Sequence, residues 1–366
     1  MPGQASTSPR HGSAGIAARL DAGVRNLPSS YFALVMATGV IAIAGRELGL
    51  PLLPDALGAL NVVAYALLWA LTVARLARHR RALLADLFDH VNGPGFFTVV
   101  AATGVLGSQF VALWAAYWVA SALWVLTLAL WTLLTFTVFA GLTIKESKPD
   151  LAGGITGGWL LAVVATQSVV VLALEIVPAV EGSLLPPLWF LALSMWLWGG
   201  MLYVWLMALI FYRHVFYAFS PADLTPPYWI NMGAMAISTL AGTLLIVHGE
   251  TAGSSLLAAI EPLLKGVTIL FWATGTWWIP MLVVLGVWRH LVKRFPLRYD
   301  AAYWGMVFPL GMYTLCSHHL ARALELGFLE GVSRVFVVAA VAAWAATFLG
   351  LVRSLVTGAG REGAVA

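Results

Sequence analysis

Long apolar stretches separated by short polar segments recur along this chain from about residue 30 to residue 356. Each stretch is long enough to cross the roughly 30 Å hydrocarbon core of a bilayer as a helix. The pattern predicts ten membrane-spanning helices, at about 30–48, 55–77, 95–112, 115–142, 155–177, 187–212, 228–248, 262–288, 302–324 and 331–356. Only a turn near Leu113 and Trp114 separates the third span from the fourth, so nine spans is the alternative.

The charges in the connections between spans change sign in alternation. Basic residues gather in every second connection: Arg75, Arg78, Arg80, Arg81, Lys145, Lys148, Arg213, Arg289, Lys293, Arg294 and Arg298. The remaining connections are mainly acidic: Glu47, Asp55, Glu175, Glu181, Glu250, Glu261, Glu325 and Glu330. Because basic loops are retained on the cytoplasmic side of a membrane, this alternation predicts that both termini are cytoplasmic.

The composition excludes a soluble protein, since 61% of the residues are hydrophobic, 10% are charged and the mean hydropathy is +0.89. The net charge of +4 lies in the connections that set orientation, so we expect a lipid bilayer and no nucleic acid as the partner. The single cysteine, Cys316, excludes an internal disulfide and a multi-cysteine metal site, and we expect no cofactor. The excess of arginine over lysine and the many alanines are typical of GC-rich bacteria, which predicts a bacterial inner (plasma) membrane protein.

The chain divides into one large domain and two tails. Residues 1–28 are rich in Gly, Ser and Ala, and we expect a mostly disordered cytoplasmic tail. A cleaved signal peptide is not expected, because the apolar run comes late and no small-residue cleavage site follows it. Residues 29–356 form the predicted transmembrane domain, and residues 357–366 a cytoplasmic C-terminal tail.

Connection lengths group the spans into five hairpins whose first members begin alike. The openings are aromatic or glycine-rich: Tyr31-Phe32, Phe96-Phe97, Gly157-Gly158-Trp159, Tyr228-Trp229 and Tyr303-Trp304. Three of them continue with an Ala-Thr pair that contains Thr38, Thr103 or Thr166. The similarity predicts an internal repeat with the odd-numbered spans around a common axis and the even-numbered spans outside them. The alternative is that aromatic belts and small packing residues occur in most membrane helices.

The ninth span, from Tyr303 to Arg322, combines a helix-breaking motif with charge. Pro309 removes a backbone donor and predicts a kink or break at Phe308 to Gly311. At 100° per residue, one stripe of this helix contains Phe308, Met312, Leu315, His319 and Arg322, whereas His318 lies off it. If Phe308 faces the axis, we expect His319 and Arg322 to face it too.

The segments from Tyr31 to Gly39, from Gly93 to Thr98 and from Trp304 to Gly311 resemble the tellurite-resistance/dicarboxylate transporter family. That family includes bacterial tellurite-resistance proteins, fungal malate and sulfite carriers and the slow-type anion channels of plant guard cells. The resemblance extends from about Tyr31 to Arg353. It implies an all-α integral membrane protein, with ten transmembrane helices as five tandem hairpins in quasi-fivefold arrangement around a central pore, assembled as a homotrimer.

The resemblance also implies a pore gate, a phenylalanine directly before a proline in the ninth helix, which corresponds here to Phe308 and Pro309. The family's pore is largely apolar, so His319 and Arg322 depart from its pattern. A guanidinium binds carboxylates through a two-pronged contact and an imidazole adds a titratable charge, so both are candidate anion-binding residues. The alternative for Arg322 is that it extends to the lipid headgroups. The hydroxyls of Thr38, Thr103 and Thr166 are further candidates, unless they bond within their own helix.

We therefore expect a protein that is not an enzyme and that transports a small anion. C4-dicarboxylates such as malate or succinate come first, with tellurite, sulfite, chloride and nitrate as alternatives, and both a channel and a proton-coupled carrier stay open. A haem-binding membrane redox protein is the remote alternative. Adjacent His318 and His319 point about 100° apart on a helix, so a second helix, for example through His248, would have to supply the other ligand. No HExxH or GxSxG motif supports a hydrolase.

Overall fold

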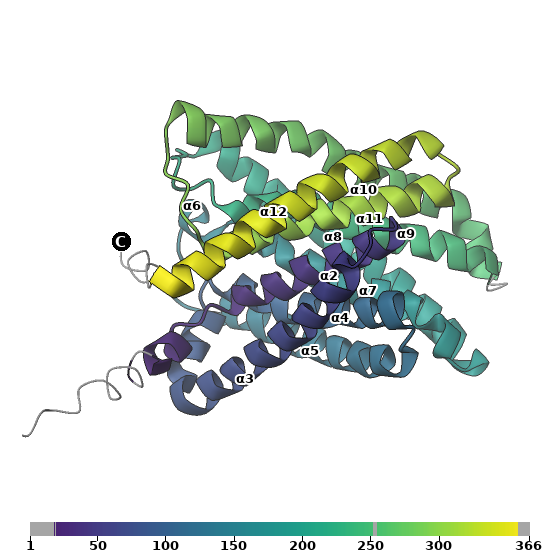
Figure 1. The fold of residues 1–366 in the computed structure, drawn as a ribbon, viewed down its shortest axis with the longest axis horizontal. Coiled ribbons are helices and arrows are strands. Elements are labelled where there is room, and N and C mark those ends of the chain that lie inside the picture. Colours follow the sequence, from purple (N-terminus) through teal and green to yellow (C-terminus); the bar gives the residue numbers. More distant parts are fainter. Residues whose placement is uncertain (1–17, 19, 252–254, 358–366) are drawn as a thin grey trace, which may run out of the picture.

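The computed structural model describes residue 18, residues 20–251 and residues 255–357, and every regular element in these residues is helical. Ten long helices run side by side through the molecule (Figure 1). They are α2 (Ala33–Glu47), α3 (Leu53–Leu87), α4 (Phe97–Trp114), α5 (Tyr117–Ile144), α7 (Leu161–Glu175), α8 (Leu185–Phe216), α9 (Ile230–Thr251), α10 (Ser255–Val287), α11 (Trp304–Ala323) and α12 (Glu330–Thr357).

These helices correspond to the ten predicted spans. Across the described part of the chain, nine segments are long and apolar enough to cross a membrane. The tenth, α11, has 20 residues but also Pro309, two histidines and Arg322, which lower its hydropathy. Helices α4 and α5 are separate, because Ala115 takes a left-handed conformation (φ 48°) that no α-helix can continue through.

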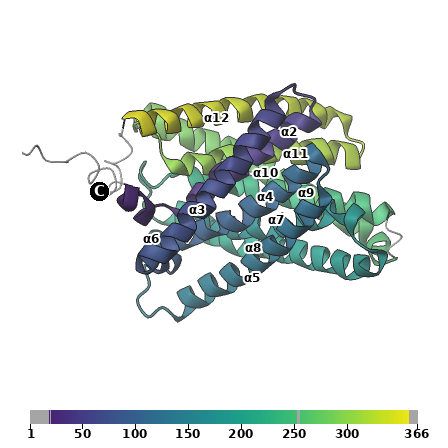
Figure 2. The same cartoon turned by 60° about the horizontal axis from the view of Figure 1, so that its bottom comes forward.

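Burial divides the helices into an inner and an outer set. In the segments that contain α2, α4, α7 and α9, 72% to 89% of the apolar window is buried, against 17% to 50% for α3, α5, α8, α10 and α12. Most residues of α11 are buried as well. Each inner helix contacts the next in the order α2, α4, α7, α9 and α11, and α11 contacts α2 again. The five inner helices therefore form a closed ring, and each packs against the outer helix that follows it in the chain. Figure 2 shows the same helices from a second side.

Each inner helix is preceded by a short 3₁₀ turn. The turns are Ser29–Phe32, Gly93–Phe96, Gly157–Leu160, Pro226–Trp229 and Ala301–Tyr303, and they coincide with the five aromatic or glycine-rich openings. A 3₁₀ turn tightens the start of a helix, and proline is tolerated there because its missing N–H has no helical partner in any case. The same turn at all five places agrees with the predicted internal repeat.

A second recurring contact connects each outer helix to the next inner helix. An aromatic N–H or O–H meets a side-chain hydroxyl in four cases: Tyr65 with Thr103 (2.9 Å), Trp131 with Thr166 (2.9 Å), Trp272 with Ser317 (3.0 Å) and Trp344 with Thr38 (3.0 Å). In the remaining case Trp196 donates to the main-chain oxygen of Ser238, at 2.8 Å. These five hydrogen bonds connect successive hairpins, and the one from Trp344 joins the last hairpin to the first.

Residues 20–25 and the last described turn of α12 lie at the end of the bundle that has the basic connections, and we call this the basic end and the opposite one the acidic end (Figure 1). Residues 20–25 are helical, unlike the disorder expected for the tail. They contact α3, where Asp21 pairs with His79 (3.0 Å) and Arg75 donates to the Arg25 carbonyl (2.8 Å). The rest of the predicted N-terminal tail, except Ala18 and residues 26–28, and the C-terminal tail beyond Thr357 lie outside the described residues.

Candidate functional site

A cavity lies on the axis of the inner ring, on the acidic side of Phe308. Its volume, measured as the space open to the centres of water molecules, is about 20 Å³, which is room for about one ordered water. All five inner helices line it. Counted from the aromatic residue that opens each helix (Tyr31, Phe96, Trp159, Tyr228 and Tyr303), the lining comes from the same positions in every repeat.

The ninth residue after each opening forms the deeper layer of the cavity: Val40, Val105, Ser168, Ile237 and Met312. The twelfth residue forms the next layer: Ile43, Ser108, Val171, Leu240 and Leu315. Steps of three and four residues keep side chains on one face of a helix. In a quasi-fivefold arrangement, equivalent residues of the five helices meet at a common axis. The cavity therefore marks the axis of the fold.

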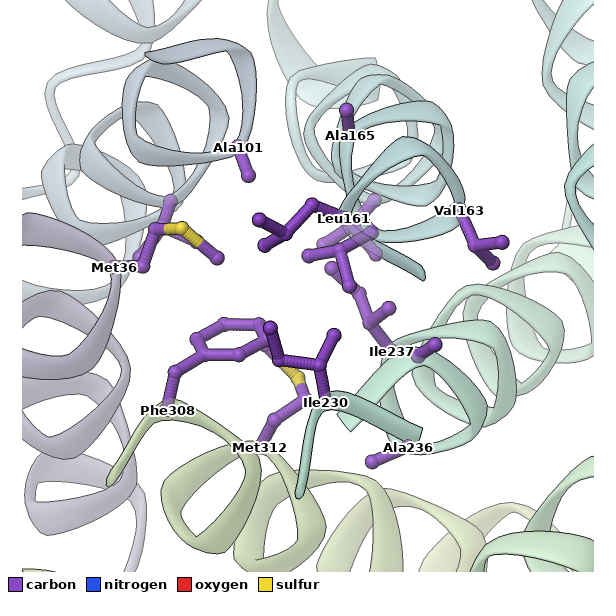
Figure 3. Close-up of a cluster of buried hydrophobic side chains, with 14 of the residues drawn as sticks. Met36, Ala101, Leu161, Val163, Ala165, Ile230, Ala236, Ile237, Phe308 and Met312 are labelled. Carbon is purple, nitrogen blue, oxygen red and sulfur yellow. The ribbon is translucent and has the colours of Figure 1, made fainter. Parts of the chain in front are cut away.

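Apolar side chains fill the axis on the basic side of this cavity. The ring of Phe308, which is 1% exposed, points toward Met36, Leu161 and Ile230, and Met312 lies directly beneath it (Figure 3). Across the ring from Met312, α4 contributes the methyl group of Ala101 (Figure 3). The phenyl ring therefore occupies the space that a small residue on α4 leaves open, and the path along the axis is closed at this level.

Pro309 does not break α11, which is helical from Trp304 to Ala323, and this corrects the expected break. The proline ring packs instead against α9, where a Cβ on Gly233 would lie 2.8 Å from its Cγ. On the other side, a Cβ on Gly311 would lie 2.7 Å from Val40 of α2. Two glycines thus allow α11 to approach both neighbours closely, and these contacts hold Phe308 at the axis.

A polar layer closes the cavity at the acidic end. His319 Nε2 lies 2.9 Å from Oε2 and 3.1 Å from Oε1 of Glu47, which joins α11 to α2. Glu175, the last residue of α7, lines the same cavity, and its Oε2 is shielded from solvent without a hydrogen-bond partner among the described residues. Ser108 of α4 contributes a hydroxyl group. The layer thus contains two carboxyl groups and one imidazole.

The predicted stripe on α11 agrees with this geometry through His319. Phe308 faces the axis, and Met312, Leu315 and His319 line the cavity. Arg322 does not line the cavity and is exposed beyond it, one turn nearer the acidic end. His318 lies off the stripe as predicted, and its Nδ1 is 2.9 Å from Oε2 of Glu330 on α12.

The three threonines lie away from the axis, contrary to the expectation that they offer hydroxyl groups to an anion. Thr103 and Thr166 donate to carbonyls of their own helix, at 2.7 and 2.8 Å. All three hydroxyls also meet the outer-helix aromatic groups described above. Their oxygens are therefore engaged between the inner and outer rings, where no axial path passes.

The haem alternative requires a histidine from a second helix to face His318 or His319. His319 is bonded to Glu47 and His318 to Glu330. The ring of His248 lies 5.5 Å from the ring of Trp189, measured between centroids. The two adjacent histidines thus point to carboxylates on different helices, α12 and α2, and not to one shared site.

Sequence reasoning missed Glu47 and Glu175, which it treated as residues of the acidic connections. A signal was present in the repeat. Glu47, Glu175 and His319 each follow the opening aromatic residue of their helix by sixteen positions (47 − 31, 175 − 159 and 319 − 303). They are equivalent residues of the first, third and fifth repeats, so a closed ring brings them to one level.

Comparison with known proteins connects this architecture with transport. A family model described as a voltage-dependent anion channel, SLAC1, matches residues 26–352. An uncharacterized membrane protein of Mycobacterium tuberculosis is 41% identical over 162 residues, which is 44% of this chain and 81% of the relative. Two uncharacterized transporters of Methanocaldococcus jannaschii are 27% identical over 315 residues (81% of this chain, 85% of the relative) and 25% identical over 321 residues (84% and 87%).

Proposed function

This chain belongs to the SLAC1 family of voltage-dependent anion channels, and on that premise we propose that small anions cross the membrane along the axis of its inner ring, with Phe308 as the gate. The observation that carries the proposal is the axial arrangement itself. Equivalent residues of five helices line a cavity on one side of Phe308, and the phenyl ring closes its continuation toward the basic end. A narrow apolar constriction blocks ions by excluding the water that hydrates them.

The gate is held in place by its neighbours, which supports a defined closed state. Pro309 fits against Gly233, and Gly311 fits against α2, so the backbone on both sides of Phe308 is fixed. The side chain extends from α11 toward the small residue Ala101 on α4 (Figure 3). We propose that the pathway opens when this ring moves away from the axis, while the contact between Pro309 and Gly233 holds α11 in place against α9.

We propose C4-dicarboxylates of the malate or succinate type as the first substrate class to test. The exposed guanidinium of Arg322, one turn beyond His319, supports attraction of a carboxylate to the acidic mouth. One observation favours a second candidate, a singly charged anion such as chloride or nitrate. Two carboxyl groups, Glu47 and Glu175, face the cavity that the substrate would cross, and they repel a dianion more strongly than a monoanion.

The setting in the cell is part of the proposal. We place the protein in a bacterial plasma membrane with the basic end cytoplasmic, which the basic connections support. We also propose a homotrimer with one pathway in each subunit. The outer helices carry many exposed large apolar side chains, among them Trp118, Phe190 and Trp277, and these suit contact with lipid or with another copy of the chain.

The test is a flux measurement on purified protein in liposomes. Uptake of radioactive malate and of chloride is compared for the wild type and for Phe308→Ala, with empty liposomes as the background. We expect faster uptake of at least one anion in the Phe308→Ala variant than in the wild type. If neither protein moves either anion above the empty liposomes, the proposed function is wrong.

A further inference from the structure

The polar layer at the acidic end carries charges of the wrong sign for a simple anion filter. Two carboxyl groups face the cavity, and the imidazole that lines it with them is already bonded to one of the two. Charges of equal sign repel strongly where water is scarce. An anion that follows the axis must nevertheless pass between Glu47 on α2 and Glu175 on α7.

Glu175 is the carboxyl group of this layer that has no imidazole or guanidinium bonded to it in the described residues, and its partner on α4 is the hydroxyl of Ser108. Its Oε2 is shielded from solvent and accepts no hydrogen bond from the described residues, although it lines a cavity with room for about one water. An ionised carboxylate oxygen in such a position is unfavourable, whereas a protonated carboxyl group can donate to a water or an anion in the cavity. Glu47 differs, because both of its oxygens lie within 3.1 Å of His319 Nε2.

The other charged groups near the layer either pair with another side chain or lie at its mouth, where the charge of Arg322 still acts on Glu47 and His319. Arg46 on α2 pairs with Asp55, and His318 on α11 pairs with Glu330 on α12. Helix α4 presents the hydroxyl of Ser108, and α9 presents only apolar side chains to the cavity. Arg322 lies at the exposed mouth, beyond the cavity. Proton uptake by Glu175 or by the Glu47–His319 pair is therefore the change that most directly makes the layer less negative.

We infer that Glu175, together with the Glu47–His319 pair, is a proton-binding site on the transport pathway, and that a small anion crosses this layer together with a proton. The inference rests on the proposed function, because it needs an anion on the axis. The proton comes from the solution at the acidic end and binds a carboxylate oxygen of Glu175. The neutral acid then offers an O–H donor to the anion, and the proton leaves with the anion or after it.

The experiment measures protons and anions together. Liposomes that contain the full-length protein enclose a pH-sensitive dye, and chloride or malate is supplied outside. We expect anion uptake to acidify the interior, with about one proton for each chloride taken up. Lowering the outside pH from about 7.5 to about 5.5 should raise the initial rate at least about fivefold.

Substitutions of Glu175, compared with a control at Glu181, test whether the proton binds at this site. Glu175→Gln imitates the neutral acid, so anion uptake should continue with less than about a twofold pH dependence and without acidification of the interior. Glu175→Asp keeps a titrating carboxyl group and should restore both. Glu181→Gln is the matched control, an exposed carboxylate of the acidic end outside the cavity, and should behave as the wild type.

The outcomes distinguish this inference from the proposed function. Anion uptake without acidification of the interior, or an unchanged pH dependence in Glu175→Gln, overturns the inference and leaves anion transport in place. Absence of anion uptake in both the wild type and Phe308→Ala overturns the proposed function, and the inference with it. Anion uptake that continues in Glu175→Gln without acidification of the interior, with the acidification restored in Glu175→Asp, supports both.

Discussion

His319 and Glu47 are separated by 272 residues of sequence, and Nε2 of the imidazole lies 2.9 Å from Oε2 of the carboxylate. The contact joins the fifth inner helix to the first at the acidic end, where it forms part of the wall of the axial cavity. The side chain of His319 is 30% exposed to solvent and that of Glu47 is 26% exposed. The pair therefore stands between the solution at the acidic end and the closed axis at Phe308, about 16 Å away along α11 at 1.5 Å per residue.

Removal of the Phe308 ring should open the axis. We expect Phe308→Ala to raise anion flux in liposomes at least about tenfold, equivalent to about 1.4 kcal/mol off the barrier at 25 °C, because the phenyl ring lies among Met36, Leu161 and Ile230 on the axis and alanine leaves its space open. Phe271→Ala is the matched control, since Phe271 is also buried but packs against Trp196 and Gly200 away from the axis. Equal flux in the two variants would show that Phe308 is a packing residue only.

The contact between Gly233 and Pro309 should be sensitive to a single methyl group. A Cβ at position 233 would lie 2.8 Å from the proline ring, so Gly233→Ala should destabilise the protein by about 1–3 kcal/mol and raise the flux through the closed state. Gly266→Ala on α10 has nothing within 4 Å and should leave stability unchanged or slightly improved. Thermal unfolding in detergent gives the first quantity and liposome flux the second. A Gly233→Ala protein as stable as the wild type would contradict the close approach of α9 and α11.

The threonines between the two rings should affect stability and leave anion selectivity unchanged. Thr38→Val and Thr166→Val each remove the acceptor of a tryptophan N–H, at a cost of about 1 kcal/mol. Thr132→Val on α5 is the control, since its hydroxyl bonds only to Leu128 of its own helix. The ratio of malate to chloride uptake is the decisive measurement. A changed ratio in Thr38→Val or Thr166→Val would mean that these hydroxyls reach the pathway after all.

Arg322 should increase the affinity of the acidic mouth for a dianion more than the rate at which the dianion crosses the pathway. Because the guanidinium is exposed at the acidic mouth, we expect Arg322→Ala to raise the half-saturating malate concentration about threefold to tenfold and that of chloride less than about twofold. The effect should decrease as the salt concentration rises. Arg334→Ala, an exposed arginine in the first turns of α12, is the control. Equal changes for malate and chloride would assign Arg322 to the lipid headgroups.

A carboxylate at the basic end should make a pH-dependent contribution to stability. The carboxylate of Asp223 accepts hydrogen bonds from the main-chain N–H (2.7 Å) and hydroxyl (2.6 Å) of Ser220 and from Arg213 (3.2 Å). Those bonds, the Ser220 ones foremost, hold the pKa of Asp223 below its ordinary value of 3.8. The folded state therefore releases this proton more readily than the unfolded state, and the stabilisation is complete above the ordinary pKa and lost as the pH falls through the lower folded value.

Asp223→Asn tests that contribution. At neutral pH it should lower the stability by at most about 1 kcal/mol, because the carboxylate is partly exposed to solvent. The difference from the wild type should shrink between about pH 4 and about pH 2. Thermal unfolding across this range, with Asp55→Asn as a control at the acidic end, measures it. A difference that stays constant with pH would mean that the carboxylate charge contributes nothing.

Much of this architecture follows from local pattern. Apolar stretches of membrane length predict the spans because a bilayer requires every backbone polar group to be paired within a helix. The aromatic openings predict the repeat, and the 3₁₀ turns at all five of them agree. On α11 the 100° rotation per residue places Phe308, Met312, Leu315 and His319 on one face, which is the face that the axis and the cavity meet. These features depend on residues that are close together in the sequence, so they can be predicted from the sequence alone.

Other features depend on which helix lies opposite, and only the tertiary structure decides that. The threonines have the same sequence context whether they face inward or outward, and their aromatic partners on the outer helices settle the matter. Arg322 shares the stripe of Phe308, but it lies past the end of the cavity. Glu47 and Glu175 end their helices in acidic connections, and ring closure brings both beside His319. Pairing across 272 residues is set by the closure of the ring, so the charge of the polar layer is a property of the assembled fold.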